Sequence, residues 1–386
     1  MRKILALPFL LYSCLGFAQQ IDTLIFYSSI FEEDRELRIH LPEFYKYASQ
    51  ELQFPIIYAL DGQHPWFIEP LKNTARYLQY THEIPQAIIV EIPHSDRVEE
   101  SLFPASMLEN TDLHSFIQTE VDSLLKVYRP GDVRILIGHS FTASFALYSF
   151  FKSPDFYSAV IAHSPLYRVE SLTDSLRMLP LPQQKRIYLS IGGLANGKDS
   201  IHRLPYERLK LLYPEFFENI HTYEADLSSH NALPIVANPY FLSLLFNNFS
   251  RRFSSIAAVD LEYSLIETPL SPEKEWHKVE SHSLLLGKPY PAEIPDINGI
   301  ISRYTNSDFL DHSEWLLKQA LRYYPHYYDF HWQLYDIYWS QGKFEKAREH
   351  LLEAYSLIDT MEREAEDWQV LLGDIDAELE KRNWQP

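Results

Sequence analysis

The sequence predicts an α/β fold with a mostly parallel central sheet flanked by helices, followed by an all-helical region. Short apolar runs alternate with helical patterns up to about residue 250, and this alternation is typical of a parallel sheet covered on both faces. Beyond that point the strand-like runs disappear, and a proline-rich stretch at 269–295 leads into helical sequence. With 386 residues, the chain is long enough for two domains.

The predicted strands are apolar runs of five to seven residues bounded by turn residues. The first alternates apolar and charged residues, which indicates a half-buried strand, and most of the later ones indicate buried strands. In chain order they are residues 36–41, 54–60, 87–92, 134–138, 158–162, 185–191 and 219–225. Helices are predicted at 113–127 and 142–151. Because reactive groups in such sheets lie on loops at the carboxyl ends of the strands, we expect the functional site there.

The chain divides into a signal peptide, an α/β domain, a junction and a helical domain, predicted at residues 1–18, 19–250, 251–295 and 296–386. The first segment has the charged start, apolar centre and small-residue end of a secretory signal. We expect cleavage after Ala18, and the alternative is a lipoprotein anchored through Cys14. The protein is therefore predicted to be secreted or periplasmic.

The helical region carries two imperfect copies of a tetratricopeptide-like spacing, followed by a predicted capping helix at 364–382. The register is set by Ala320, Pro325, Gly342, Phe344, Ala347, Leu351 and Ala354. An aromatic stripe within it is predicted to pack between helices, because a concave ligand surface normally needs three or more repeats. That stripe consists of Trp332, Tyr335, Tyr338 and Trp339.

Composition excludes several classes of partner. The formal net charge is −19, which argues against nucleic acid and anionic membrane surfaces because their phosphates would be repelled. The single cysteine, Cys14, lies in the signal, so the mature chain is expected to have no disulfide, thiolate metal site or cysteine nucleophile. No segment after the signal is apolar enough to be an integral membrane helix. A small neutral, apolar or cationic substrate fits better.

A serine stands at a sharp turn where a buried strand ends. The run 134–138 leads into His139 and Ser140, and an apolar helix follows directly, which is the context of a nucleophile elbow. Such a turn exposes the Ser140 hydroxyl and places the Phe141 amide where it can stabilise an oxyanion. Thr142 departs from the pattern, because a glycine usually stands there and a β-branched residue crowds the turn.

The remaining catalytic groups are predicted from the chain order serine, acid, histidine that accompanies such an elbow. His230 follows the last predicted strand and is the expected base. Asp199 follows the preceding strand and is the expected acid, with Glu224 and Asp226 as weaker alternatives. A serine and histidine pair with a polar helper also remains open.

Other residues near the predicted site are assigned lesser roles. The second oxyanion donor is expected from the backbone of residues 61–63, with Gly62 as the candidate, although a plain turn is an equal alternative. His139 is predicted to be a spacer in the elbow. Further histidines are expected to be structural or solvated, namely His163, His202 and His221.

Taken together, these residues resemble the putative esterase family of α/β-hydrolases, which includes enterobactin esterase-like and esterase D-like enzymes. The resemblance covers residues 21–248 and rests on 55–62, 128–129, 138–142, 164–165 and 229–230. The tail resembles the tetratricopeptide-like extension of some secreted bacterial members. The resemblance implies a serine carboxylesterase without metal or cofactor, with Ser140 as nucleophile, His230 as base and the Phe141 amide in the oxyanion hole.

The leading prediction is a secreted serine hydrolase that cleaves a small-molecule carboxylic ester through an acyl-enzyme. Siderophore, feruloyl, acetyl-sugar and thioester acyl groups all remain open as substrates. One alternative is a catalytically silent binding protein of the same fold, whose helical repeats dock a protein partner. The other is an acyltransferase that uses an alcohol instead of water.

Overall fold

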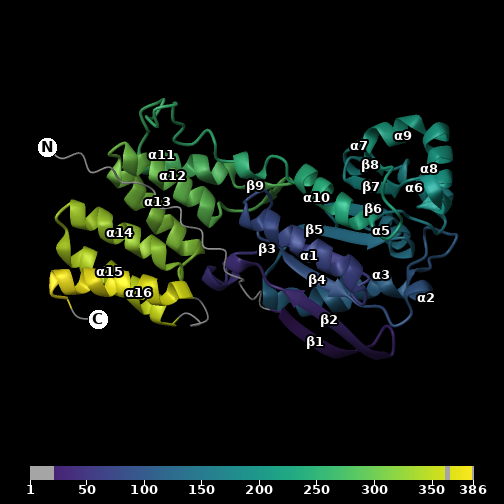
Figure 1. The fold of residues 1–386 in the computed structure, drawn as a ribbon, viewed down its shortest axis with the longest axis horizontal. Helices are drawn as coiled ribbons and strands as arrows, with labels where there is room; N and C mark the ends of the chain where they lie inside the picture. Colours follow the sequence, from purple (N-terminus) through teal and green to yellow (C-terminus); the bar gives the residue numbers. More distant parts are fainter. Residues whose placement is uncertain (1–20, 361–365, 385–386) are drawn as a thin grey trace.

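The structure is a computed structural model that describes residues 21–360 and 366–384, so the predicted signal peptide at 1–18 lies outside the described residues. An eight-stranded sheet forms the centre of the α/β part, in the order β1-β2-β4-β3-β5-β6-β7-β8 (Figure 1). The strands are β1 (Ile21–Ser28), β2 (Glu33–His40), β3 (Phe54–Leu60), β4 (Ile88–Ile92), β5 (Pro130–His139), β6 (Ala159–His163), β7 (Ile187–Gly192) and β8 (His221–Ala225).

The sheet is parallel from β4 to β8 and antiparallel where β1, β2 and β4 pair. All seven residues of β3 are buried, which explains why this strand is a continuous apolar run in the sequence. Its side chains alternate between two cores, with Tyr58 and Leu60 in one and Ile57 and Ala59 in the other. The predicted α/β fold class is confirmed.

Helices cover both faces of the sheet. Apolar side chains of α1 and α10 share a core with Ile57, whereas those of α3, α5, α6 and α8 share a core with Tyr58. The helices of this part are α1 (Pro65–Tyr80), α2 (Arg97–Ser101), α3 (Asp112–Phe116), α4 (Asp122–Leu125), α5 (Phe141–Lys152), α6 (Val169–Leu176), α7 (Leu181–Gln184), α8 (Ser200–Leu212), α9 (Pro214–Asn219) and α10 (Leu233–Leu245). Short helical turns are η1 (Glu43–Tyr47), η2 (Ile117–Val121), η3 (Lys126–Tyr128), η4 (Ala195–Gly197) and η5 (Phe249–Arg251).

Two elements of the α/β part differ from the prediction. The edge strand β1 was not predicted, because its apolar residues fall on both faces and Ile25 and Tyr27 are exposed, which leaves no clean alternation. The helix predicted at 113–127 is divided into α3, a π-helical turn at η2, α4 and a 3₁₀ turn at η3.

The second part of the chain is helical. It contains α11 (Pro272–His282), α12 (Ile294–Asn306), α13 (Leu310–Tyr323), α14 (Tyr328–Ser340), α15 (Phe344–Thr360), α16 (Glu366–Arg382) and a small hairpin of β9 (Leu284–Leu285) with β10 (Lys288–Pro289). The segment predicted as a junction, 251–295, thus includes a regular helix. Tyr335 and Tyr338 of the aromatic stripe are buried between helices. Within the described ranges, no helix has the length and apolar character needed to cross a bilayer.

The helical part contacts the sheet at the amino ends of its parallel strands. The Ser49 amide, before β3, donates to the Tyr323 carbonyl at 2.7 Å, and the Gln86 amide, before β4, donates to the Glu293 carboxylate at 2.7 Å. A seven-residue strand such as β3 is roughly 23 Å long. Because the loops expected to carry function lie at the opposite ends of these strands, the helical part lies away from them (Figure 1).

Candidate active site

Ser140 occupies a strained turn between β5 and α5. Its backbone has φ 61° and ψ −116°, a region that a serine adopts only when its surroundings hold it there. The Ser140 amide donates to the His163 carbonyl at 2.8 Å, and its carbonyl accepts from the Ser144 amide at 3.1 Å. Gly138 makes the turn possible, because a Cβ there would lie 2.4 Å from the Thr142 carbonyl oxygen. The turn has the geometry of a nucleophile elbow.

His230 lies beside this elbow and contacts the predicted acid. Its Nδ1 lies 2.9 Å from Oδ1 of Asp199, and its ring centroid is 4.2 Å from that of His139, the residue before Ser140. Because Nδ1 is engaged, Nε2 is the nitrogen left to accept a proton. No hydrogen bond joins the Ser140 hydroxyl to His230 in the described part of the chain; such bonds often tighten only when substrate binds.

Asp199 is a buried, charged carboxylate with 2% of its surface exposed. Its Oδ2 accepts from the Gly192 amide at 2.8 Å and from the Ser164 hydroxyl. Burial alone would raise the pKa of Asp199, but polar contacts with His202, His230 and Ser164 hold that pKa well below its usual range. The group is therefore fit to orient a histidine and to stabilise its cation.

A glycine pair after β7 brings the acid and histidine loops together. A Cβ on Gly192 would lie 2.7 Å from the Asp199 Cβ, and one on Gly193 would lie 1.9 Å from the Asp226 carbonyl oxygen. The Gly193 amide donates to the Ser228 carbonyl at 3.0 Å, and the Gly193 carbonyl accepts from the Asp199 amide at 2.8 Å. Any side chain at either glycine would force the two loops apart.

The two weaker acid candidates are engaged elsewhere. Glu224 pairs with Arg203 at 2.7 Å, and Asp226, whose side chain is 76% exposed, pairs with the same arginine at 3.1 Å. Among the acids that the sequence proposed, Asp199 is the one that contacts His230.

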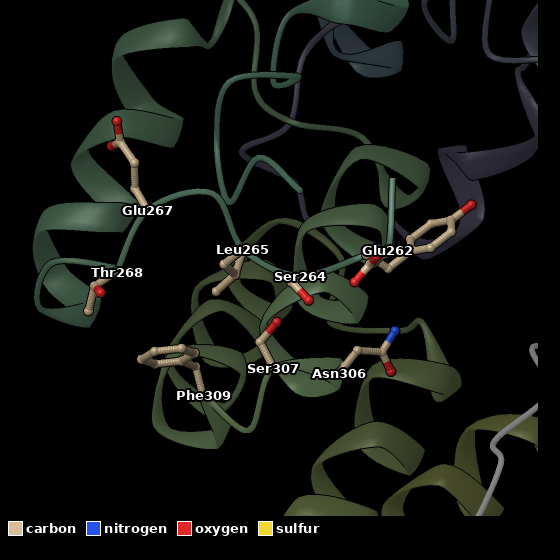
Figure 2. Close-up of a pocket in the computed structure, with 9 residues that line it drawn as sticks. Glu262, Ser264, Leu265, Glu267, Thr268, Asn306, Ser307 and Phe309 are labelled. Carbon is tan, nitrogen blue, oxygen red and sulfur yellow. The ribbon is translucent and has the colours of Figure 1, made fainter. Parts of the chain in front are cut away.

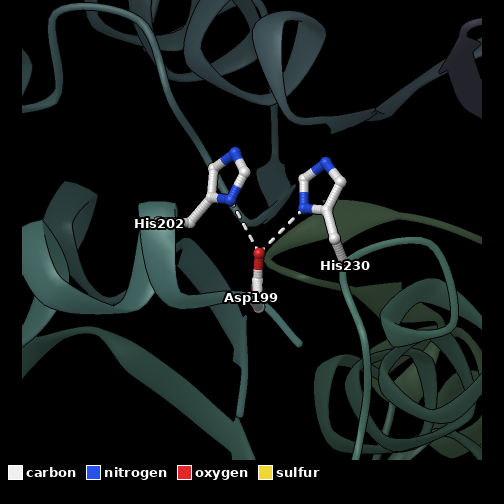
Figure 3. Close-up of side chains that lie close together, drawn as sticks. All are labelled: Asp199, His202 and His230. Carbon is white, nitrogen blue, oxygen red and sulfur yellow. Dashed lines mark hydrogen bonds and ion pairs between the residues drawn. The ribbon is translucent and has the colours of Figure 1, made fainter. Parts of the chain in front are cut away.

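A second histidine shares the acid (Figure 3). The ring of His202 lies parallel to that of His230, with centroids 4.1 Å apart and planes within 8°, and its Nδ1 is 2.7 Å from the same Asp199 oxygen. Sequence reasoning gave His202 no part in the site. Its position three residues after Asp199, in the first turn of α8, was the available signal, because residues three apart on a helix lie side by side. Ser164, which formed part of the family resemblance, was likewise given no role, yet its hydroxyl donates to Asp199.

These three side chains also offer one oxygen and two nitrogens of the kind that hold transition metals. However, a histidine lone pair lies in the plane of its ring, and two parallel rings direct their lone pairs along separate planes. Both Nδ1 atoms already approach Asp199. The geometry suits proton handling better than coordination of one ion.

The hydrogen bonds of the loop after β3 show that Gly62 is not the second oxyanion donor. The Gly62 amide donates to the Ile92 carbonyl at 3.1 Å and so has no hydrogen left for an oxyanion. Glycine is required there because a Cβ would lie 2.8 Å from the Pro93 nitrogen. The next amide, of Gln63, has no acceptor among the described residues. Gln63 therefore replaces Gly62 as the candidate donor.

The Phe141 amide is the other candidate. Phe141 opens α5, and the first amides of a helix have no acceptor within it. The positive end of the helix dipole also lies at this point. The arrangement can therefore stabilise negative charge that develops next to Ser140.

His139 does more than separate its neighbours. Burial, together with the nearby His230 and His163, lowers the pKa of His139 to about 2, so its ring is neutral. Its Nε2 lies 3.0 Å from the His230 carbonyl, to which it donates. This bond ties the elbow to the loop that carries the candidate base.

A hollow of about 590 Å³ lies elsewhere, in the helical part (Figure 2). It is formed between the loop that contains Glu262 and Glu267 and the turn that contains Asn306 and Ser307. None of the residues that line it belongs to the candidate active site.

Comparison with known proteins supports the fold. Residues 28–210 match the model of the family described as "Putative esterase". An IroE-like serine hydrolase from Shewanella oneidensis is similar at 17% identity with a TM-score of 0.58, covering 78% of this chain and 99% of that one. An uncharacterised protein from Capnocytophaga ochracea is similar at 15% identity and a TM-score of 0.54, covering 93% and 100%. A ferulic acid esterase is similar at 15% identity and a TM-score of 0.50, covering 61% and 100%. No curated protein matches the chain.

Proposed function

We propose that the chain, whose residues 28–210 match the model of the putative esterase family, is a carboxylesterase-type hydrolase that cleaves its ester in two steps through an acyl-enzyme. In the first step, His230 Nε2 takes the proton of the Ser140 hydroxyl while Oγ attacks the ester carbonyl carbon. The tetrahedral intermediate then expels the alcohol, which receives that proton from His230. In the second step, His230 takes a proton from water, the hydroxide attacks the acyl carbon, and Ser140 Oγ leaves with the proton.

The negative charge of each tetrahedral intermediate is assigned to two backbone amides. The amide of Phe141 comes from the start of α5 and that of Gln63 from the loop after β3. Donors of this kind are fixed before the reaction begins and need no rearrangement during it. Asp199 keeps the His230 ring in the tautomer that presents Nε2 and stabilises the imidazolium.

The observation that carries this proposal is the bond between Asp199 Oδ1 and His230 Nδ1 beside an elbow with φ 61° at Ser140. A buried carboxylate with a depressed pKa, a histidine and a strained serine are grouped on three loops at the carboxyl edge of one sheet. Backbone strain of this kind concentrates at functional sites, so the φ of 61° and ψ of −116° at Ser140 favour a catalytic role over a purely structural one.

The test is intact-mass analysis of the mature protein after incubation with a fluorophosphonate. We expect one adduct in the wild type, none in Ser140→Ala, and one in the matched control Ser171→Ala, a serine on α6. Circular dichroism checks that Ser140→Ala folds. No adduct in a folded wild type would overturn the proposal and favour the silent binding protein. Product analysis with an added sugar acceptor separates hydrolysis from acyl transfer.

The substrate and the cellular setting are also proposals. A small ester fits the net charge of −19, which disfavours phosphate-rich partners. Secretion or a periplasmic location is inferred from residues 1–18 alone. A library of siderophore, feruloyl, acetyl-sugar and thioester substrates, compared by kcat/KM, would identify the acyl group.

A further inference from the structure

We propose that Thr142 and Asp61 are positioning residues, which hold the loop of one oxyanion donor against the elbow that carries the other. This inference rests on the proposed function and adds two residues outside the triad. Thr142 Oγ1 lies 2.6 Å from Asp61 Oδ2, although 81 positions separate them in the chain. Both residues are fully buried, so water does not compete for the bond.

The single proton of the Thr142 hydroxyl goes to Asp61. The hydroxyl accepts from the His139 amide at 2.9 Å and has two acceptors within reach, the Asp61 carboxylate and the His139 carbonyl at 2.9 Å. That carbonyl already accepts from Arg97 Nη2 at 2.7 Å. A carboxylate is also the stronger acceptor, so the charge-assisted bond to Asp61 is favoured.

Arg97 completes the link from a third segment. Its Nε lies 2.5 Å from Asp61 Oδ1 and its Nη2 lies 3.1 Å from Oδ2. Arg97 compensates the buried charge of Asp61, without which a carboxylate at this depth would be costly. The same guanidinium binds the His139 carbonyl, so the strand β5, the loop after β3 and helix α2 meet at one carboxylate.

The side-chain bonds hold Asp61 in an unusual backbone conformation. Its φ is 64°, in the left-handed region that a non-glycine residue occupies only under constraint. The Asp61 carbonyl accepts from the His64 amide at 2.8 Å, which closes a turn around Gln63. The Gln63 amide therefore keeps a fixed place relative to the Phe141 amide as long as Thr142 holds Asp61.

The bond between Thr142 and Asp61 explains why a threonine stands at position 142, where a glycine is usual. A glycine there would pack closely but would offer no hydroxyl, whereas Thr142 both fits the turn and bonds across to the oxyanion loop. Oxyanion stabilisation depends on donors that are placed to within a fraction of an ångström, so loosening this link should slow the chemical step more than it weakens binding.

The experiment compares Thr142→Val, which keeps the shape and removes the hydroxyl, with Thr142→Ser, which keeps the hydroxyl. With a p-nitrophenyl ester, we expect kcat to fall about ten- to a hundredfold in Thr142→Val with little change in KM, and most of kcat to return in Thr142→Ser. Amide hydrogen exchange over residues 61–64 should be faster in Thr142→Val than in wild type. Circular dichroism and the melting temperature check that both variants fold.

An unchanged kcat in Thr142→Val, or an equal loss in both variants, would overturn the inference. If Thr142→Val does not fold, Asp61→Asn, which keeps the shape and removes the charge, takes its place. Its kcat should fall with little change in KM, and its amide exchange over residues 61–64 should be faster than in wild type. A wild type that neither hydrolyses esters nor reacts with a fluorophosphonate would defeat the proposed function and the positioning role of Thr142 with it. If the wild type is active but amide exchange over residues 61–64 is unchanged in Thr142→Val, the proposed function stands and only the positioning role of the bond between Thr142 and Asp61 is overturned.

Discussion

Oδ1 of Asp199 lies 2.9 Å from Nδ1 of His230, although the two residues are 31 positions apart. The contact arises because β7 and β8 are adjacent parallel strands, so the loops that follow them leave the same edge of the sheet. The first strand is followed by Asp199 and the second by His230. A glycine pair then allows the two loops to touch.

We expect Asp199→Asn to lower kcat by about 10⁴-fold, the loss typical when a triad acid becomes an amide and the histidine takes the wrong tautomer. Initial rates with a p-nitrophenyl ester measure it. The matched control is Asp226→Asn, an exposed acid of the neighbouring loop that contacts Arg203 instead, and its kcat should stay within about twofold of wild type. If Asp199→Asn kept more than a tenth of the wild-type kcat, Asp199 would not be the acid.

Gly138→Ala should destabilise the protein, because the new Cβ would lie 2.4 Å from the Thr142 carbonyl oxygen and neither backbone segment can move freely. We expect a loss of about 1–3 kcal/mol in the free energy of unfolding, measured with urea. Gly373→Ala in α16 is the control, because nothing lies within 4 Å of its added Cβ. It should be neutral or slightly stabilising. Equal stability of the two variants would contradict the packing described for the elbow.

Local sequence pattern predicted what depends on neighbours along the chain. The buried run of β3, the turn at Ser140 and the helix after it are each determined by contiguous residues, and their predicted ranges agree with the structure to within a few positions. The order of strands then placed His230 and Asp199 on adjacent loops. The edge strand β1 was not predicted, because its apolar residues follow no simple period along the sequence.

Contacts between distant segments could not be predicted. The Gly62 amide is occupied by Ile92, a residue thirty positions away on another strand, and the sequence around Gly62 carries no sign of it. The bond between Thr142 and Asp61 is similar, because crowding at Thr142 was foreseeable but a buried acceptor was not.

Stability should fall in mildly acidic solution because buried histidines are held neutral. Burial lowers the pKa of His163 to about 4, while an unfolded histidine titrates near its ordinary value of 6.5. Below pH 6.5 the unfolded state therefore binds a proton at His163 that the folded state does not bind. The stabilisation from this group is fully present above 6.5 and is lost as the pH falls toward 4, up to about 3 kcal/mol.

Urea unfolding at pH 7, 6 and 5 tests this prediction. The loss of unfolding free energy over that range should be smaller in His163→Gln than in wild type, because glutamine does not titrate and can still bond Ser190 and Asn238. The starting stability of the variant does not matter, since only the change with pH is compared. Parallel curves for both proteins would show that His163 is not the group responsible.

The opposite pH dependence is expected where the helical part meets the α/β part. His82, just after α1, lies 2.7 Å from Asp296 and 3.5 Å from Glu293, both at the start of α12. Arg252 pairs with the other oxygen of Asp296 at 3.0 Å, and the Tyr290 hydroxyl donates to Glu293 at 2.6 Å. A cationic His82 therefore connects the two parts of the chain at neutral pH.

Burial alone would lower the pKa of His82, but the hydrogen bond to Asp296 and the nearby carboxylate of Glu293 raise it to about 9. The folded state thus holds a proton that the unfolded state releases near 6.5, so this stabilisation is fully present below 6.5 and is lost as the pH rises through 9. At its largest it amounts to about 3 kcal/mol. We expect His82→Asn, which tolerates the φ of 58° at this position, to be less stable than wild type at pH 6 and nearly equal to it at pH 10.

Urea unfolding at both pH values measures that difference, and His277→Asn is the matched control. His277 is an exposed histidine of α11 that also pairs with a carboxylate, Glu280, at 2.7 Å, but it contributes little because surface pairs are weak. A deficit in His82→Asn that is the same at pH 6 and pH 10 would mean that His82 acts through packing against Phe249 rather than through its charge. A deficit that disappears at high pH would establish that an ion pair holds the helical part against the amino ends of the sheet.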